Sequence, residues 1–310
     1  MSNKILITDT LFIGDEHVKQ IEAAGYEVER IEKADATEDE LIQAIKGKVG
    51  YVLGGIEKVT DKVIEAADQL KVIAFTGADW KALITGWEKA GEKGIKISNA
   101  PGANSPAVAE FALAMTLVMQ RNLLELGRTG DVQSQTAETI QGATIGVIGA
   151  GHIGSKIIKM LSNFAPSRVL YHTREKYPGV ESDGAEYADL DKLLTTSDII
   201  IIAAPGTAGT LLDKRAIESL KDNALIVSIS PRNLIDFDTL LTRLQKGTLR
   251  AAIDWPAPSE DYSKLPLHTF YYTNNHTAYN TKAVIKICSD MGTKSLLNLL
   301  KTGEDKYRVN

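Results

Sequence analysis

The sequence predicts an α/β protein of two domains, at least one of which is a doubly wound parallel sheet. Short apolar runs typical of buried parallel strands alternate along the chain with segments whose apolar residues recur at helical spacing. One strand-to-helix junction carries three glycines in the pattern G-x-G-x-x-G, at Gly149, Gly151 and Gly154. The length of 310 residues is typical of two domains rather than one.

The first 99 residues alternate strand and helix, which predicts a small α/β sandwich around a parallel sheet. One helix starts with a capping box, in which Thr37 is followed three residues later by Glu40. Strands are expected at residues 5–8, 26–31, 49–53, 71–75 and 95–98, and helices at 16–24, 37–45, 60–67 and 80–89. Ligands of such folds bind at the carboxyl ends of strands, so the glycine turns at 54–55 and 77–78 are candidate binding turns.

Residues 99–105 read Asn-Ala-Pro-Gly-Ala-Asn-Ser, which is typical of a hinge between domains. Ser105 suits the N-cap of a helix and Pro106 suits its first turn. The helix expected from there to about residue 127 is apolar nearly all round, so it should be packed on two sides. A subunit interface and burial within the chain both explain such a helix.

The glycine pattern follows an expected strand at residues 144–148 and precedes a helix at 155–164 and a second strand at 168–172. In a dinucleotide-binding turn, the first glycine permits the tight turn and the second lets the backbone approach a pyrophosphate. The third lets the helix pack on the strand. His152 and Ile153, in the turn that leads into this helix, would offer backbone N–H groups to the phosphates. The alternative is a glycine turn that binds no ligand.

The alternation continues to the end of the sequence. Helices are expected at residues 190–195, 214–220 and 237–245, and strands at 198–204, 224–230, 249–255 and 271–274. A long helix at 281–302 is expected to return to the first domain.

Composition narrows the possible functions. The net charge of −5 does not favour nucleic-acid binding, and 44% apolar with 24% charged residues is typical of a soluble globular protein. One cysteine, Cys288, permits neither an intrachain disulfide nor a cysteine-based zinc site, and its apolar neighbours indicate a buried, inert thiol. The sequence shows no metal site, signal peptide or membrane span, so a cytoplasmic protein without membrane partners is expected.

Five motifs together resemble one family, the D-isomer-specific 2-hydroxyacid dehydrogenases, which are relatives of phosphoglycerate, glyoxylate, formate and phosphite dehydrogenases. The motifs are Asn-Ala-Pro-Gly at 99–102 with Val-Ala-Glu at 108–110, the glycine turn at 149–154, and the segments 205–210, 252–254 and 275–278. The resemblance covers nearly the whole chain. It implies a Rossmann-type dinucleotide-binding domain, residues 100–280, inserted into a smaller flavodoxin-like substrate-binding domain, residues 1–99 and 281–310. It also implies a homodimer built on the long helix after the hinge.

The resemblance further implies hydride transfer between a nicotinamide cofactor and a small 2-oxo or 2-hydroxy acid, with His276 as the acid/base. The ordinary pKa of histidine, near 6.5, suits reversible proton transfer. The backbone of Gly77 and Ala78 is expected to bind the substrate acid. The residues expected to bind the cofactor are Gly149, Gly151, His152, Ile153, Gly154, Thr173, Arg174, Pro205, Thr210 and Asp254.

Two catalytic positions depart from the family pattern. The family arginine falls on Pro231, so Arg232 would serve only if its loop shifts by one residue. The family glutamate falls on Ser259, and Glu260 is one residue later. Two functions therefore stay open: an oxidoreductase that uses His276, Arg232 and Glu260, or a dinucleotide-binding sensor or corepressor-like module with lost or altered catalysis.

The end of the second Rossmann strand predicts the cofactor. Thr173 stands where NAD-specific members have an acid, which removes the repulsion of a 2′-phosphate. Arg174 could then pair with that phosphate, so NADP(H) is preferred and NAD(H) remains possible. The alternative is that Arg174 is a solvated charge, like Glu175 and Lys176 beside it.

Overall fold

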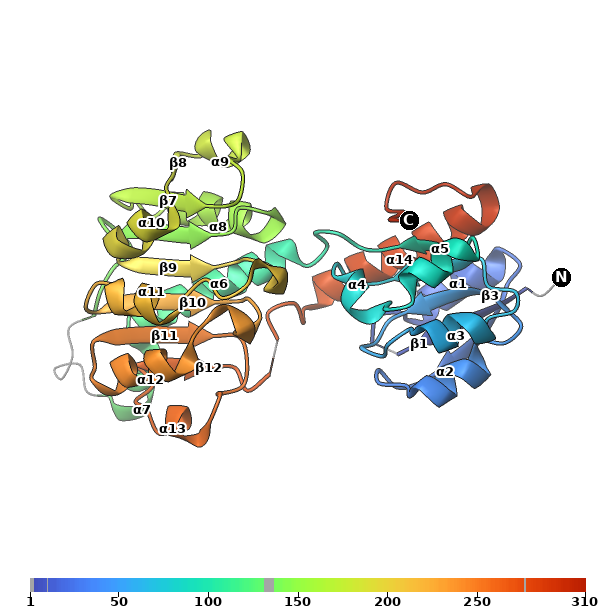
Figure 1. Ribbon diagram of the computed structural model, residues 1–310, viewed down its shortest axis with the longest axis horizontal. Helices are drawn as coiled ribbons and strands as arrows, with labels where there is room; N and C mark the ends of the chain where they lie inside the picture. Colours follow the sequence, from blue (N-terminus) through green and yellow to red (C-terminus); the bar gives the residue numbers. More distant parts are fainter. Residues whose placement is uncertain (1–2, 10, 131–136, 276) are drawn as a thin grey trace. The chain divides into compact units, whose positions relative to one another are not determined.

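The computed structural model describes residues 3–9, 11–130, 137–275 and 277–310, and the chain folds as two compact units. The first unit comprises Met1–Asn104 and Asn280–Asn310, and the second comprises Ser105–Tyr279. Each unit is built on its own parallel sheet (Figure 1).

The sheet of the first unit has five parallel strands in the order β2-β1-β3-β4-β5. The strands are β1 (Lys4–Thr8), β2 (Glu27–Ile31), β3 (Lys48–Leu53), β4 (Val72–Phe75) and β5 (Lys96–Ser98). This is the flavodoxin-like order, in which the direction of winding changes between β1 and β3. The predicted fold class of this region is confirmed.

Both faces of the first sheet are covered. Ile5 and Ile7 of β1 pack with α1 (Asp15–Ala23) and α14 (Lys282–Thr302), whereas Leu6 packs with the helices of the opposite face. Those helices are α2 (Glu38–Ala44), which starts with the predicted capping box, α3 (Asp61–Ala66) and α5 (Trp87–Glu92). The last helix, α14, therefore packs on the first unit, as predicted. Its Cys288 is buried, and burial raises the pKa of the thiol to about 11.

The prediction of a single helix at residues 80–89 is wrong, because the chain forms two short helices there, α4 (Trp80–Leu83) and α5. Backbone groups of Val59 interrupt it. The Val59 N–H donates to the carbonyl of Leu83 at 2.8 Å, and the Val59 carbonyl accepts from the N–H of Gly86 at 2.9 Å. A Cβ at Gly86 would lie only 2.7 Å from the backbone of Thr60, so this close approach requires glycine.

The sheet of the second unit has seven parallel strands in the order β12-β11-β10-β9-β6-β7-β8. The strands are β6 (Thr144–Ile148), β7 (Arg168–His172), β8 (Ala185–Tyr187), β9 (Ile199–Ile202), β10 (Ala224–Ser228), β11 (Leu249–Ile253) and β12 (Phe270–Tyr272). The order is that of a doubly wound dinucleotide-binding sheet with one further strand, β12. The predicted doubly wound fold is confirmed, although β8 and the short helices α9 (Pro178–Glu181) and α13 (Glu260–Ser263) were not predicted.

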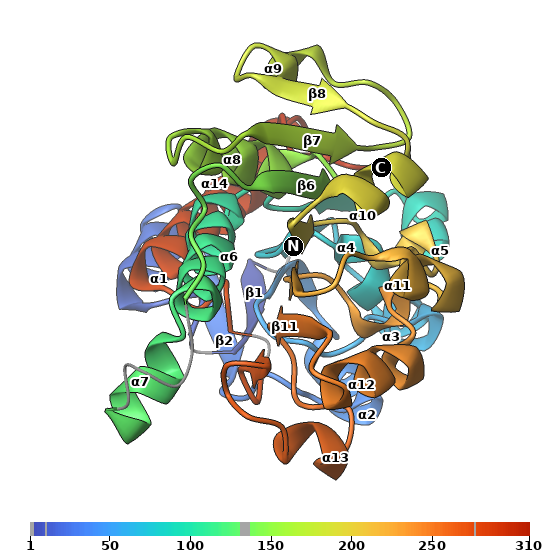
Figure 2. The same cartoon turned by 90° about the vertical axis from the view of Figure 1, so that its left-hand side faces the viewer.

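Helices cover both faces of the second sheet (Figure 2). On one face lie α6 (Ser105–Gln120) and α8 (His152–Ser162), and on the other lie α10 (Leu190–Thr196), α11 (Lys214–Ser219) and α12 (Phe237–Gln245). Because both faces are covered, the central strand β9 consists of four buried isoleucines.

The long helix predicted at residues 106–127 is also wrong, because α6 ends at Gln120 and α7 (Leu123–Thr129) follows at an angle of 54°. Asn122 has a left-handed backbone (φ 51°), and the guanidinium of Arg250 donates to the carbonyl of Met119 at 3.2 Å. Ser105 is the first helical residue rather than the N-cap, and among the described residues its buried hydroxyl has no hydrogen-bond partner. Taken singly, none of the described helices is long and apolar enough to cross a membrane; α6 and α7 pass that test only as a bent pair.

Candidate active site

The turn after β6 contains three glycines, and a side chain would fit at only the second of them. A Cβ at Gly149, whose φ is +95°, would lie 2.5 Å from the carbonyl oxygen of Ala203. A Cβ at Gly154 would lie 1.8 Å from the carbonyl oxygen of Gly149. At Gly151, the N-cap of α8, no described atom lies within 4 Å of the Cβ position. The first and third glycines thus serve packing, and the second leaves space for a ligand.

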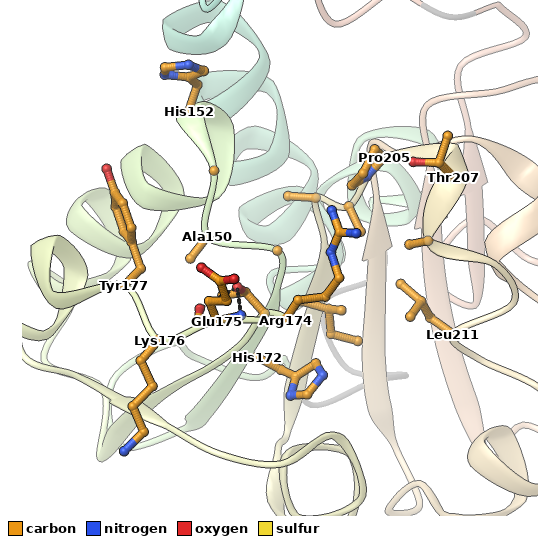
Figure 3. Close-up of a pocket in the computed structure, with 17 residues that line it drawn as sticks. Ala150, His152, His172, Arg174, Glu175, Lys176, Tyr177, Pro205, Thr207 and Leu211 are labelled. Atoms are coloured by element: carbon orange, nitrogen blue, oxygen red, sulfur yellow. Dashed lines mark hydrogen bonds between the residues drawn. The ribbon is translucent and has the colours of Figure 1, made fainter.

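A cavity of about 560 Å³ lies at the carboxyl ends of β6, β7 and β9, where the winding of the sheet reverses (Figure 3). Such switch points are where open α/β sheets bind ligands. The first N–H groups of α8 have no partner within the helix, and no side chain in the described part of the chain caps them, so this end of the cavity suits an anion. The lining residues come from the glycine turn (148–152), the turn after β7 (172–177) and the segment after β9 (203–205, 207, 208 and 211).

The turn after β7 is held by its own hydrogen bonds. The Thr173 hydroxyl donates to the carbonyl of Glu175 at 2.7 Å and accepts from the N–H of Glu175 at 3.2 Å. In Figure 3 the side chain of Arg174 crosses the cavity toward Pro205, whereas the ammonium of Lys176, which also lines the cavity, points away from it and lies 5.4 Å from the centre of the Tyr187 ring. The Thr173 hydroxyl is therefore used largely within the turn, and Arg174 is the cation that faces the cavity.

The cavity contains part of the predicted cofactor set. Six predicted residues line it: Gly149, Gly151, His152, Thr173, Arg174 and Pro205. Ile153 packs against the core instead, and Thr210 donates its hydroxyl to the carbonyl of Asn233 at 3.3 Å, which joins two turns. Thr207 and Leu211 line the cavity but were not predicted: Thr207 belongs to the motif at 205–210, from which only Pro205 and Thr210 were chosen, and Leu211 directly follows that motif.

Asp254, at the end of β11, is fully buried and anchors the segment that follows β12. Its Oδ1 accepts from the hydroxyl of Thr273 at 3.0 Å and from the N–H of Thr277 at 3.1 Å, and its Oδ2 accepts from the N–H of Ala278 at 3.0 Å. These bonds flank His276, which itself lies outside the described residues. Asp254 was predicted to bind the cofactor, but its described hydrogen bonds are all within the protein.

Arg232 and Glu260 both lie on the surface of the second unit. The guanidinium carbon of Arg232 is 5.6 Å from the centre of the Phe237 ring. Glu260 starts α13, which is fixed by the buried Tyr262, and its exposed carboxylate has no polar partner within the described ranges. The structure does not bring Arg232 and Glu260 into the cavity beside α8.

The turn after β4 in the first unit offers two free N–H groups. The carbonyl of Gly77 accepts from the N–H of Ala100 at 2.8 Å, and the carbonyl of Ala78 accepts from the side-chain amide of Asn99 at 2.8 Å. The N–H groups of Gly77 and Ala78 donate to no acceptor among the residues described. Neighbouring N–H groups of this kind suit a carboxylate.

The turn after β3 contains a buried acid. Glu57 is only 4% exposed, and its Oε1 accepts from the hydroxyl of Tyr51 at 2.7 Å. Its Oε2 has no hydrogen-bond partner within the described chain. Burial raises the pKa of Glu57 above its ordinary value, and the nearby charge of Asp9 adds to this rise.

Glu16, His17 and Asp290 bring three potential metal ligands together, but their chemistry favours an ion-pair network. The Nε2 of His17 lies 2.9 Å from Asp290, and the ammonium of Lys286 lies 3.2 Å from Asp290 and 3.5 Å from Glu16. The Nδ1 of His17 is buried and has no partner among described atoms. A metal on Nε2 would place the proton on that Nδ1, where nothing accepts it. The cluster therefore ties α1 to α14.

A doubly wound sheet with an open G-x-G-x-x-G turn at its switch point defines the class of dinucleotide-binding proteins. Within that class, residues 111–278 match the family model of the D-isomer specific 2-hydroxyacid dehydrogenase NAD-binding domain. The chain therefore belongs to the D-isomer specific 2-hydroxyacid dehydrogenase family. The resemblance read from the sequence motifs is confirmed.

Individual relatives agree. A D-3-phosphoglycerate dehydrogenase of Methanocaldococcus jannaschii is 34% identical over 258 residues, which are 80% of this chain and 48% of that relative, so the chain spans about half its length. A hydroxypyruvate reductase of Thermotoga maritima is 32% identical over 223 residues, which are 69% of this chain and 71% of that relative. The apo-structure of D-lactate dehydrogenase from Escherichia coli superposes with a TM-score of 0.82 at 25% identity, covering 99% of this chain and all of that one.

Proposed function

We propose that the chain is an oxidoreductase that transfers a hydride between NADP(H) and a small 2-oxo or 2-hydroxy acid. The observation that carries the proposal is the open space at Gly151, which lies at the uncapped N-terminus of α8 and lines the cavity of about 560 Å³. A pyrophosphate fits there, because the backbone can approach it and the helix N–H groups face it. A bound nicotinamide cofactor supplies or accepts the hydride.

The proposed preference for NADP(H) rests on Arg174. Its guanidinium faces the cavity, and no carboxylate stands at Thr173 to repel a 2′-phosphate. Glu175 in the same turn is the opposing charge, and Lys176 keeps the balance of the turn positive. NAD(H) remains a possible cofactor because most of the lining is uncharged backbone and small apolar residues.

The chain's own groups have the following proposed roles. The N–H groups of Gly77 and Ala78 bind the substrate carboxylate, so the first unit is the substrate-binding domain. His276 gives a proton to the carbonyl oxygen during reduction and takes it from the hydroxyl during oxidation. Asp254 holds the segment around His276 through the hydroxyl of Thr273 on one side and the backbone N–H groups of Thr277 and Ala278 on the other. Arg232 and Glu260 are the proposed replacements for the displaced family arginine and glutamate.

A sensor or corepressor-like module is the second candidate function. It is favoured by the surface positions of Arg232 and Glu260, which leave the ordinary arginine and glutamate of the family without a replacement in the cavity. Such a module would bind the dinucleotide and catalyse nothing.

We further propose a homodimer, because one side of α6 stays partly exposed and apolar. The side chains on it are Phe111, Leu113, Leu117 and Val118. A cytoplasmic location, and the absence of nucleic-acid and membrane partners, remain predictions from the sequence.

Fluorescence titration with NADPH and NADH, followed by turnover assays against a panel of 2-oxo acids, tests the function. Tight NADPH binding and reduction of at least one acid are the expected results. Binding without turnover on any acid would favour the sensor, and failure to bind either dinucleotide would contradict both candidates. Sedimentation at two protein concentrations tests the dimer.

A further inference from the structure

The carboxyl edge of the first sheet is formed by the turns that follow β1, β3 and β4. In a sheet of this order, ligands bind at this edge, near the switch point between β1 and β3. The first two turns are in contact there. The N–H of Gly54 donates to the Thr8 hydroxyl at 3.3 Å, and a Cβ at Gly54 would lie 3.4 Å from the Cβ of Asp9.

These turns carry more negative than positive charge. Asp9, Glu57 and Asp79 lie in them against one lysine, Lys58, and α1 adds further acids in its first turn. Of the nearby cations, Arg30 donates to the backbone carbonyls of Asp9 and Ile13, at 3.1 and 2.6 Å. A phosphate placed here would add charge of the sign that is already in excess.

The first two positions of the turn after β3 accept only glycine, so neither of them can carry a cationic side chain. A Cβ at Gly54 would lie 2.5 Å from the carbonyl oxygen of Thr8, and one at Gly55 would lie 2.3 Å from that of Ala34 and 2.2 Å from the buried Glu57. Ile56 and Lys58 are therefore the side chains of this turn that reach outward, one on each side of Glu57.

Two large apolar side chains are exposed at the same edge. Ile56 is 69% exposed and Leu11 is 47% exposed, in the turns after β3 and β1. No large apolar side chain in the described part of the chain is more exposed than Ile56. Their apolar surface would gain from a ligand that covers it, because burial of each methylene group is worth roughly a fourfold change in affinity.

On the basis of the proposed function, we propose that the substrate acid carries an uncharged, apolar side chain that packs on Leu11 and Ile56, and that phosphorylated acids are excluded. The acid's carboxylate is held by the N–H groups of Gly77 and Ala78. Its side chain then extends along the edge toward the turns after β3 and β1, where it meets apolar surface and carboxyl groups that outnumber the one lysine of these turns, Lys58.

The test compares kcat/KM for three acids: pyruvate, 4-methyl-2-oxopentanoate and 3-phosphohydroxypyruvate. The branched acid should exceed pyruvate by on the order of 50-fold, the product of three buried carbons at roughly fourfold each. The phosphorylated acid should fall below pyruvate by about tenfold or more, because like charges repel at this edge.

Alanine variants test whether Leu11 and Ile56 cause the preference for the branched acid. Ile56→Ala and Leu11→Ala should each lower the ratio of kcat/KM for the branched acid to that for pyruvate by about tenfold, through KM. Ile287→Ala is the matched control, because Ile287 is another exposed isoleucine of the first unit, at 41%, but lies on α14. It should leave the ratio unchanged.

Three results would overturn the inference. One is equal or better turnover of the phosphorylated acid, with loss of that activity in Lys58→Met, which would show phosphate binding at Lys58. Another is an equal loss for both acids in Ile56→Ala. Both of these leave the oxidoreductase intact. The third, binding of NADPH with no turnover of any acid, is distinct because it removes the proposed function and the substrate assignment together.

Discussion

The carboxyl edges of the two parallel sheets are both built on glycine turns, but the space that the glycines leave is used differently. In the second unit, the Cβ position of Gly151 has no described neighbour within 4 Å. In the first unit, the corresponding positions of Gly54 and Gly55 meet the backbone of Thr8 and Ala34 and the side chain of Glu57 within 2.5 Å. A glycine at the end of a parallel strand thus marks a ligand site only where nothing of the protein fills the space.

The same two edges also differ in charge. Arg174 faces the cavity of the second unit, with the uncapped end of α8 opposite the turn that carries it. The edge of the first unit holds Glu57 and Asp9, close enough that the charge of Asp9 helps to raise the pKa of Glu57. The second unit is therefore suited to a phosphorylated ligand and the first is not.

The largest expected effect tests whether the chemistry belongs to the second unit. His276→Ala should lower kcat by about 10²–10⁴, which is the usual contribution of a positioned general acid or base. Stopped-flow turnover together with NADPH titration measures it. Unchanged cofactor affinity is expected, and near-wild-type turnover would remove His276 from the mechanism.

The next largest effect tests the difference in charge between the carboxyl edges of the two sheets. Arg174→Ala should weaken NADPH binding by about 10–100-fold, because a charge-assisted hydrogen bond contributes roughly 1.5–3 kcal/mol. NADH binding should change little. Lys176→Ala is the control, since the ammonium of Lys176 lies over the ring of Tyr187 and points away from the cavity. Equal loss of both cofactors in Arg174→Ala would show that Arg174 does not read the 2′-phosphate.

Two smaller effects distinguish the roles of Gly151 and Gly154 in the turn after β6. Gly154→Ala should reduce the free energy of unfolding by roughly 1–3 kcal/mol, because its Cβ overlaps a backbone oxygen. Gly151→Ala should leave unfolding unchanged, since its backbone is ordinary (φ −69°) and its surroundings are open. It should still weaken cofactor binding by about tenfold, or roughly 1.4 kcal/mol. Urea denaturation and fluorescence titration measure the two effects, and a Gly151→Ala protein with full affinity would contradict the open-site interpretation.

The smallest expected effect is on the pH dependence of stability, and it concerns Glu57 in the turn after β3. Because the folded pKa of Glu57 is raised above 4.5, folding favours its protonated form. The resulting stability is fully present below the unfolded pKa and is lost as the pH rises through the folded pKa. Urea denaturation at about pH 4 and about pH 8 should show a smaller fall in stability for Glu57→Gln than for the wild type. Glu92→Gln, at an exposed position of α5, should keep the wild-type fall; an identical fall in both variants would exclude Glu57 as its source.

Local signals predicted most of the fold. The capping box at Thr37 and Glu40, the four isoleucines of β9 and the glycine pattern each determine an element from neighbouring residues alone. The predictions from the sequence were wrong where a helix is interrupted by groups that are distant in the chain. The break before α5 depends on backbone bonds from Val59, and the break after α6 coincides with a hydrogen bond from Arg250, far along the chain.

The site was predictable to the same extent. The glycine motif and Arg174 can each be picked out from a short stretch of sequence, and Gly149, Gly151 and Arg174 line the cavity. The engagement of the Thr173 hydroxyl within its own turn, and the anchoring role of Asp254, depend on three-dimensional hydrogen bonds that no spacing reveals. The burial of Glu57 between exposed neighbours is likewise a result of packing.

The position of α14 has a consequence for the order in which the nascent chain can fold. The five strands of the first sheet leave the ribosome before α14 does, and the whole contiguous second unit is made in between. Until α14 emerges, Leu296 and Leu299 cannot cover the apolar face around Ile5 and Ile7. We therefore expect the second unit to fold during synthesis, while the first sheet keeps an apolar face available to chaperones until α14 has been made.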